Sequence, residues 1–233
     1  MSLISNVDKI LSRKENINEI GYLKRSVSYG NDLSIVKGLD LKSILTEPAK
    51  NDSITTIKEL KVVSSATSER TESELMLVEA VDKEPLDLFY RFLEAKGLTF
   101  PKSTFATYYN IAEEYMYALK YYFNRARPDQ IAPYHGIEIN VLHTETHHTP
   151  SYPSGHTMYS ELAAHIASDE YPEHKEIFFK LSDYCGLARV LQGVHYPSDN
   201  QASKIAISKL YPKIKEKINE YQKSQVVPPD GRT

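Results

Sequence analysis

After residue 66, the hydrophobic positions of the chain repeat with the spacing of α-helices. Pro85 predicts an interruption of the first helical stretch, and Gly97 predicts its end. A second stretch, between Pro101 and Pro128, contains no helix breaker and therefore predicts one long helix.

Two further helices are predicted from apolar stripes. The segment after Gly155 places Met158, Leu162 and Ile166 at intervals of four residues, which lie on one face of a helix. A last helix is expected to begin near Asp199, so the predicted fold class is all-α. A helix from about Pro172 to Leu191 is predicted to bury the stripe Ile177, Leu181, Tyr184, Ala188 and Leu191.

The residue pattern along the chain predicts three structural parts. Residues 1–66 carry no long helical period and are expected to form an N-terminal extension of short helices and loops packed on the core. Residues 67–224 are expected to form one helical domain, and residues 225–233 a disordered tail. Within the domain, residues 129–152 are a polar, histidine-containing loop that is too long to be a simple connector.

Composition excludes several classes of protein. The 233 residues are 41% hydrophobic and 25% charged, as in ordinary globular proteins, and the net charge of −3 gives no general attraction to nucleic acid or to anionic membranes. Cys185 is the one cysteine, so no internal disulfide can form. We find no secretory signal and no apolar run approaching the roughly 20 residues that span a bilayer, so a cytoplasmic location without a membrane partner is expected.

Lys120 and Arg127 are candidates for binding an anion. They are seven residues apart near the end of the predicted long helix, so their side chains should point in nearly the same direction. Pro128 favours an extended backbone at Arg127, which would project that side chain from the helix end. The simpler interpretation is an exposed basic helix end that interacts with the helix dipole.

Residues 153–156 read PSGH and precede a predicted helix. Ser154 can cap that helix, and Gly155 lets a ligand approach the backbone without a Cβ in the way. Free N–H groups and the helix dipole favour an anion at this point, within reach of His156. Taken alone, an ordinary capped helix start explains the same residues.

A third segment, residues 188–199, reads ARVLQGVHYPSD. Asp199 follows His195 by four residues, so its carboxylate can accept a hydrogen bond from one imidazole nitrogen. The other nitrogen would then be free to act as a nucleophile or a base. The alternative is a capping aspartate next to a surface histidine.

Together and in this order, KYYFNRARP (120–128), PSGH and ARVLQGVHYPSD resemble the three-part signature of the type 2 phosphatidic acid phosphatase (PAP2) superfamily. ALKYYFNRARP and SYPSGHT look closest to the soluble bacterial class A nonspecific acid phosphatases. The resemblance covers residues of about 105–210. It implies a helical bundle with the active site at the ends of the core helices. Ala188 departs from the family pattern, which usually has serine there.

The resemblance implies a metal-independent phosphatase that hydrolyses phosphomonoesters and needs no cofactor. His195 would attack phosphorus to form a phosphohistidine, Asp199 would orient His195, and His156 would protonate the leaving oxygen. A bell-shaped pH profile centred on acid to neutral pH is then expected, because His156 must start protonated and His195 neutral. The phosphate would be held by Lys120, Arg127, Ser154, Gly155 and Arg189.

Two alternatives stay open. Vanadate would occupy the same donors as phosphate, so the chain could be a vanadate-dependent haloperoxidase, or it could be a non-catalytic phosphate-binding or structural protein with a relic site. The partners expected are a small phosphorylated substrate, vanadate as an inhibitor, and a second copy of the chain in a homo-oligomer. His143, Glu145, His147 and His148 match no common metal-ligand spacing and predict a polar loop near the pocket mouth.

Overall fold

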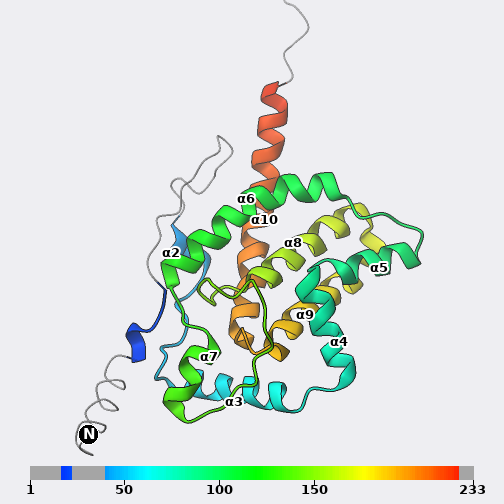
Figure 1. The fold of residues 1–233 in the computed structure, drawn as a ribbon. Coiled ribbons are helices and arrows are strands. Elements are labelled where there is room, and N and C mark those ends of the chain that lie inside the picture. Colours follow the sequence, from blue (N-terminus) through cyan, green and yellow to red (C-terminus); the bar gives the residue numbers. More distant parts are fainter. Residues whose placement is uncertain (1–16, 23–39, 226–233) are drawn as a thin grey trace, which may run out of the picture.

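The computed structural model describes residues 17–22 and 40–225, and within these residues the regular structure is entirely helical (Figure 1). The predicted all-α class is therefore confirmed. The helices in chain order are η1 (Ile17–Glu19), α2 (Leu41–Ile44), α3 (Ile54–Ser68), α4 (Glu72–Lys83), α5 (Asp87–Ala95), α6 (Lys102–Phe123), α7 (Pro128–Ile131), η2 (Ala132–His135), α8 (Gly155–Glu170), η3 (Pro172–His174), α9 (Lys175–Leu191) and α10 (Pro197–Gln225).

Helix α8 is the central element of the bundle. It packs against α6, α9 and α10, and Figure 1 shows these helices around it. Met158, Leu162 and Ile166 are buried on α8, as their spacing predicts. At the N-terminus of α8, the N–H of Ser154 donates to the Asp199 carbonyl of α10, and Gly155 lies against Met116 of α6.

Helix α6 is shorter at its C-terminal end than the sequence predicts. It ends at Phe123, and Asn124 adopts a left-handed conformation with φ 48° while its N–H donates to the Lys120 carbonyl. Arg127 is extended, with φ −80° and ψ 161°, as expected before Pro128. Lys120 and Arg127 are therefore not on one helix. The prediction that a spacing of seven residues on a helix points both side chains in the same direction is wrong.

The buried face of α9 also differs from the predicted stripe. Ile177 and Tyr184 are 37% and 52% exposed, whereas Phe178 and Cys185 are buried. Helix α9 packs on α8 and α4, and the face it turns to them includes polar side chains such as Arg189. A stripe chosen by hydrophobicity alone misses a buried face that also carries polar residues.

One of the expected boundaries falls inside a helix, and another lies almost wholly outside the described residues. The boundary at residue 66 falls inside α3, which continues to Ser68 and contacts α9. The expected tail, residues 225–233, lies outside the described residues apart from its first residue, Gln225, which ends α10. Between η2 and α8, residues 136–154 form an irregular segment that crosses the N-terminal end of α8.

Candidate active site

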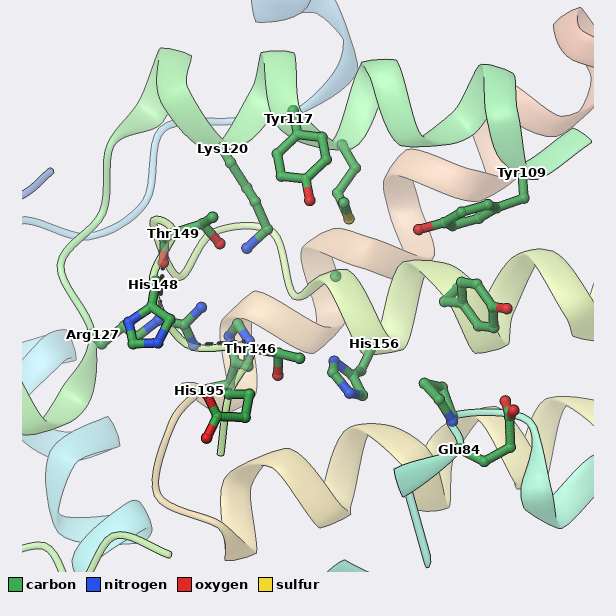
Figure 2. A pocket seen from close by; sticks show the side chains of 15 residues that line it. Glu84, Tyr109, Tyr117, Lys120, Arg127, Thr146, His148, Thr149, His156 and His195 are labelled. Atoms are coloured by element: carbon green, nitrogen blue, oxygen red, sulfur yellow. Dashed lines mark hydrogen bonds between the residues drawn. The ribbon is translucent and has the colours of Figure 1, made fainter. Parts of the chain in front are cut away.

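A pocket of about 550 Å³ opens beside the N-terminus of α8 (Figure 2). Five of the eight predicted site residues line it: Lys120, Arg127, Gly155, His156 and His195. Ser154, Arg189 and Asp199 lie behind this lining, where each is at most 1% exposed and hydrogen-bonds to neighbouring residues. The structure thus gathers residues that are up to 79 positions apart in the sequence, from Lys120 to Asp199.

His195 and Asp199 form a buried pair at the start of α10. The Nδ1 atom of His195 lies 3.0 Å from Oδ2 of Asp199. That contact fixes Nδ1 as the protonated nitrogen, so Nε2 carries the free lone pair. Nε2 lies 3.2 Å from Nη1 of Arg127 and faces the pocket (Figure 2). Burial lowers the pKa of His195 well below its usual value, and the charges of Arg127 and Lys120 lower it further.

Arg125 holds the other side of Asp199. Its Nη1 donates to Oδ1 of Asp199 at 2.7 Å, and its guanidinium stacks 3.8 Å from the ring centroid of Tyr196. The N–H of Tyr196 donates to Oδ2 of Asp199 at 3.0 Å. Burial raises the pKa of Asp199, while Arg125 and the Tyr196 N–H oppose that shift. Asp199 is therefore fixed at both oxygens.

Glu59 of α3 connects this pair to a third helix. Its Oε2 accepts a hydrogen bond from Nη2 of Arg125 at 2.9 Å. Both of its oxygens also bind Ser198, one from the backbone N–H at 2.8 Å and one from the hydroxyl at 2.9 Å. Glu59 therefore caps the N-terminus of α10 and neutralises Arg125 with one carboxylate.

Lys120 and Arg127 reach the pocket from different segments. Lys120 is 2% exposed, and its Nζ donates to the Pro150 carbonyl. Arg127 is 1% exposed, and it donates to the carbonyls of Thr149 and Val194 at 2.9 and 2.8 Å. Burial lowers the pKa of both side chains, and for Lys120 the nearby charge of Arg127 lowers it further. Neither cation forms an ion pair with a carboxylate in the described part of the chain, and two cations held so close together favour a bound anion.

The start of α8 has the geometry expected from PSGH. The Ser154 hydroxyl accepts hydrogen bonds from the N–H and the hydroxyl of Thr157, so it caps the helix. A Cβ on Gly155 would lie 2.9 Å from Sδ of Met116, so glycine lets α6 and α8 approach each other beside the pocket. The Ser154 side chain is occupied as a cap, whereas Gly155 lines the pocket.

His156 lines the pocket one residue inside α8. Burial lowers its pKa well below the usual value, and the positive charge of Arg189 lowers it further. A bound phosphate would counter that charge and favour the protonated imidazole. His156 can therefore gain a proton as an anion binds and donate it within the pocket.

Arg189 is paired with a carboxylate that the sequence does not single out. Its Nη1 donates to Oδ1 of Asp82 on α4 at 2.6 Å and also contacts Gln192, and its Nη2 donates to Thr146 at 3.1 Å. Burial alone would raise the pKa of Asp82, but hydrogen bonds from Thr144 and Arg189 outweigh it and lower that pKa. The Nε atom of Arg189 is buried and has no hydrogen-bond partner among residues 17–22 and 40–225.

Sequence reasoning missed Arg125, Glu59 and Asp82. Arg125 carried a signal, because it precedes Arg127 by two residues in the same RARP segment. Glu59 and Asp82 carried none, because they lie far before the signature on α3 and α4. Only the packing of these helices against α9 and the start of α10 brings their carboxylates to the site.

The histidine-containing loop lies at the pocket mouth. His148 and Glu145 line the pocket, and Nε2 of His143 lies 2.8 Å from Oε1 of Glu145. Across residues 17–22 and 40–225, no three His, Cys, Asp or Glu side chains are grouped so that they could hold a metal ion. No helix in this part of the chain is long and apolar enough to cross a membrane.

Three comparisons relate this chain to known proteins. The model of the PAP2 superfamily matches residues 103–208. A non-specific acid phosphatase of Salmonella typhi is 32% identical over 83 residues, which are 30% of this chain and 33% of that protein. The alignment thus spans about a third of the relative's length.

Among solved structures, the transmembrane PAP2 type phosphatidylglycerolphosphate phosphatase from Bacillus subtilis is similar with a TM-score of 0.50 and 18% identity. The similarity covers 72% of this chain and 89% of that one, and it shows a common fold. The residues from Lys120 to Asp199 that form the pocket all lie within the matched segment. Residues 103–208 of this chain are therefore similar in sequence to the PAP2 superfamily, and the fold is similar to that of a PAP2 phosphatase.

Proposed function

We propose that the protein is a phosphatase that hydrolyses phosphomonoesters through a phosphohistidine on His195, without a metal ion. One observation carries the proposal: Nε2 of His195, the unprotonated ring nitrogen, lines the pocket within 3.2 Å of Nη1 of Arg127 and beside Lys120 and His156. A nucleophile, an acid and two anion-binding cations in one cavity are the groups that phosphoryl transfer needs. The similarity to two proteins named as phosphatases supports the same reading.

In the first step, Nε2 of His195 attacks phosphorus while the bond from phosphorus to the ester oxygen breaks. His156 gives its proton to that oxygen, so the alcohol leaves neutral. The imidazolium that forms on His195 is stabilised by Asp199. The charge on the three equatorial oxygens is matched by Lys120, Arg127 and the N-terminus of α8, with Arg189 behind them.

In the second step, water attacks phosphorus and the bond from phosphorus to Nε2 of His195 breaks. His156, now neutral, takes a proton from the water and returns to its starting state. Inorganic phosphate is released, and His195 is again neutral. Vanadate is expected to inhibit, because it adopts the five-coordinate geometry of both transition states.

The test is hydrolysis of 4-nitrophenyl phosphate in excess EDTA. We expect wild-type protein to release phosphate, His195→Ala to lose at least about 10³-fold in kcat as a nucleophile knockout does, and His143→Ala, on an exposed histidine, to match wild type. Quenching during turnover with alkali and a denaturant, in which phosphohistidine survives, should trap a phosphoryl group on wild-type protein and none on His195→Ala; the trapped group should be lost in acid. Full activity in His195→Ala would overturn the nucleophile, and activity that EDTA abolishes would overturn metal independence.

The haloperoxidase alternative is not proposed, because both similar proteins are named as phosphatases. The same preparations separate the two functions. Protein loaded with vanadate and given peroxide and bromide should not oxidise the halide above the rate of free vanadate. A protein that oxidises bromide and leaves the aryl phosphate intact would favour the haloperoxidase.

A further inference from the structure

The pocket is larger than an inorganic phosphate requires. Its volume of about 550 Å³ is in the range of sites that hold a whole small molecule. Along α6 the lining residues run from Tyr109 to Lys120, eleven positions apart, which is about 16 Å along the helix axis. The part beyond the phosphate site must therefore accommodate the rest of the substrate.

The two ends of the pocket differ in chemistry, as Figure 2 shows. Lys120, Arg127 and His195 form a cationic end, whereas Glu84 and Tyr109 lie at the opposite end with His156 between them. Tyr159 and Pro85 line the pocket as well. We call Glu84, Pro85, Tyr109 and Tyr159 the acidic aromatic subsite.

The proposed reaction places the leaving group in this subsite. The leaving oxygen must lie opposite His195 and next to His156, because His156 protonates it. Tyr159 follows His156 by three residues on α8, which is about 5 Å along the axis. A substituent on the leaving oxygen that points away from His195 therefore reaches Tyr159 within a few bonds.

Glu84 of the subsite, and Glu113 behind Tyr109, carry negative charge that no described side chain neutralises. Glu84 accepts a hydrogen bond from the N–H of Leu86 at 3.1 Å, and Glu113 accepts one from the Tyr109 hydroxyl at 2.8 Å. Neither carboxylate forms an ion pair with a residue in the described part of the chain. Burial raises the pKa of Tyr159 to about 12, and the charge of Glu84 contributes to that shift.

The aromatic rings of the subsite also attract positive charge. Tyr109 and Tyr159 pack edge to face, with centroids 4.7 Å apart, at the wall of the pocket. Aromatic faces attract cations, and an ammonium group surrounded by such rings and a carboxylate is held by both. An uncharged group gains only contact area there, and an anionic group is repelled.

We propose that the acidic aromatic subsite selects phosphomonoesters whose leaving group carries an ammonium ion. This inference rests on the proposed phosphatase function and names its substrate class. Such a substrate is a dipole that matches the pocket, with the phosphate at Lys120 and Arg127 and the cation at Glu84. Glu84, Tyr109 and Tyr159 are then specificity-determining residues.

The test compares esters that differ only in charge. Phosphocholine is paired with 3,3-dimethylbutyl phosphate, and 6-aminohexyl phosphate with heptyl phosphate, so that both short and long linkers are sampled. Each ester is used as a competitive inhibitor of 4-nitrophenyl phosphate hydrolysis. We expect the cationic member of at least one pair to inhibit about tenfold more strongly, the size of one well-formed cation–aromatic contact with a carboxylate nearby.

Glu84→Gln should reduce that ratio toward one and leave inhibition by the neutral ester unchanged. Glu94→Gln, on the exposed side of α5, is the matched control and should keep the wild-type ratio. A ratio of one for both pairs in wild type, or a full ratio in Glu84→Gln, would overturn the inference while aryl phosphate hydrolysis continues. If wild type does not hydrolyse the aryl ester, the proposed function fails, and calorimetric titration of the same esters still tests the subsite.

Discussion

At the scale of single residues, the site concentrates positive charge away from water. Lys120, Arg127 and Arg189 are each at most 2% exposed, and burial lowers the pKa of each. Arg189 has Asp82 as a counter-ion, whereas Lys120 hydrogen-bonds only to a carbonyl among the described residues. Burying an ammonium without a carboxylate costs free energy that other parts of the fold must offset.

Replacing Lys120 should therefore change stability and activity in opposite directions. Lys120→Met is expected to raise the free energy of unfolding by about 1 kcal/mol or more in phosphate-free buffer, because it removes an unpaired buried charge of similar shape. It should also lower kcat/KM by about 10²-fold or more, as loss of one donor to a transition-state oxyanion does. Thermal unfolding and steady-state kinetics measure the two effects.

Lys180→Met, on the exposed side of α9, is the control for Lys120→Met and should change neither quantity. A Lys120→Met protein that is less stable than this control would show that the ammonium stabilises the empty site.

At the scale of secondary-structure elements, the positions of the helices were predicted from the sequence more accurately than which of their faces are buried. The breaks at Pro85 and Gly97 and the spacing along α8 depend on local chemistry, and they are confirmed. The predicted end of α6 was wrong, and the predicted buried face of α9 was right at Ala188 and Leu191 but wrong at Ile177 and Tyr184. Both depend on which neighbour a helix packs against, and single-sequence periodicity does not contain that information.

The site residues likewise divide into those that the sequence signature predicts and those that only helix packing reveals. The eight residues of the signature lie in or directly behind one pocket, because their order and spacing carry the information. Glu59 and Asp82 belong to helices whose sequences contain no signature. Their importance becomes visible only once α3 and α4 are placed beside Arg125 and Arg189.

The contact between α3 and α10 can be tested through Glu59. Glu59→Gln removes the ion pair with buried Arg125 and weakens the cap of α10, so it should lower the free energy of unfolding by roughly 2–4 kcal/mol. It should also lower kcat, because Arg125 helps to fix Asp199. Chemical denaturation and kinetics at saturating substrate provide both values.

Glu69→Gln, at the exposed C-terminus of the same helix, should behave like wild type in both assays. Equal stability of Glu59→Gln and Glu69→Gln would mean that α3 does not hold the start of α10.

At the scale of the whole molecule, the lowered pKa values make stability depend on pH and on bound anion. His156 and His195 have a lower pKa in the folded protein than in the unfolded chain. The unfolded chain therefore binds more protons below about pH 6.5, and the free energy of unfolding falls as the pH falls. Phosphate in the pocket favours the protonated histidines and opposes that loss.

We expect the melting temperature to drop between pH 7 and pH 5 and to recover in part when phosphate is added at constant ionic strength. A pH series by calorimetry, with sodium chloride in place of phosphate as the control, measures this. His195→Asn should show a weaker dependence on pH than wild type. A melting temperature that phosphate leaves unchanged at every pH would contradict an anion site in this pocket.

Two carboxylates that pair with buried arginines of the site come from helices outside residues 103–208, Glu59 with Arg125 and Asp82 with Arg189, whereas Asp199, inside that segment, also pairs with Arg125. Residues 103–208 thus contain Lys120, Arg127 and His195, and the preceding helices bring Glu59, Asp82 and the pocket wall at Glu84. A fragment cut at the limits of the family match would lack the carboxylate of Asp82 beside Arg189 and would leave Arg125 with Asp199 alone, so the matched segment is smaller than the unit that holds these ion pairs. Glu84 and Pro85, one part of the proposed leaving-group subsite, are therefore encoded before the matched segment, and exchange of the helices that contain them between relatives is expected to alter substrate preference more than the reaction itself.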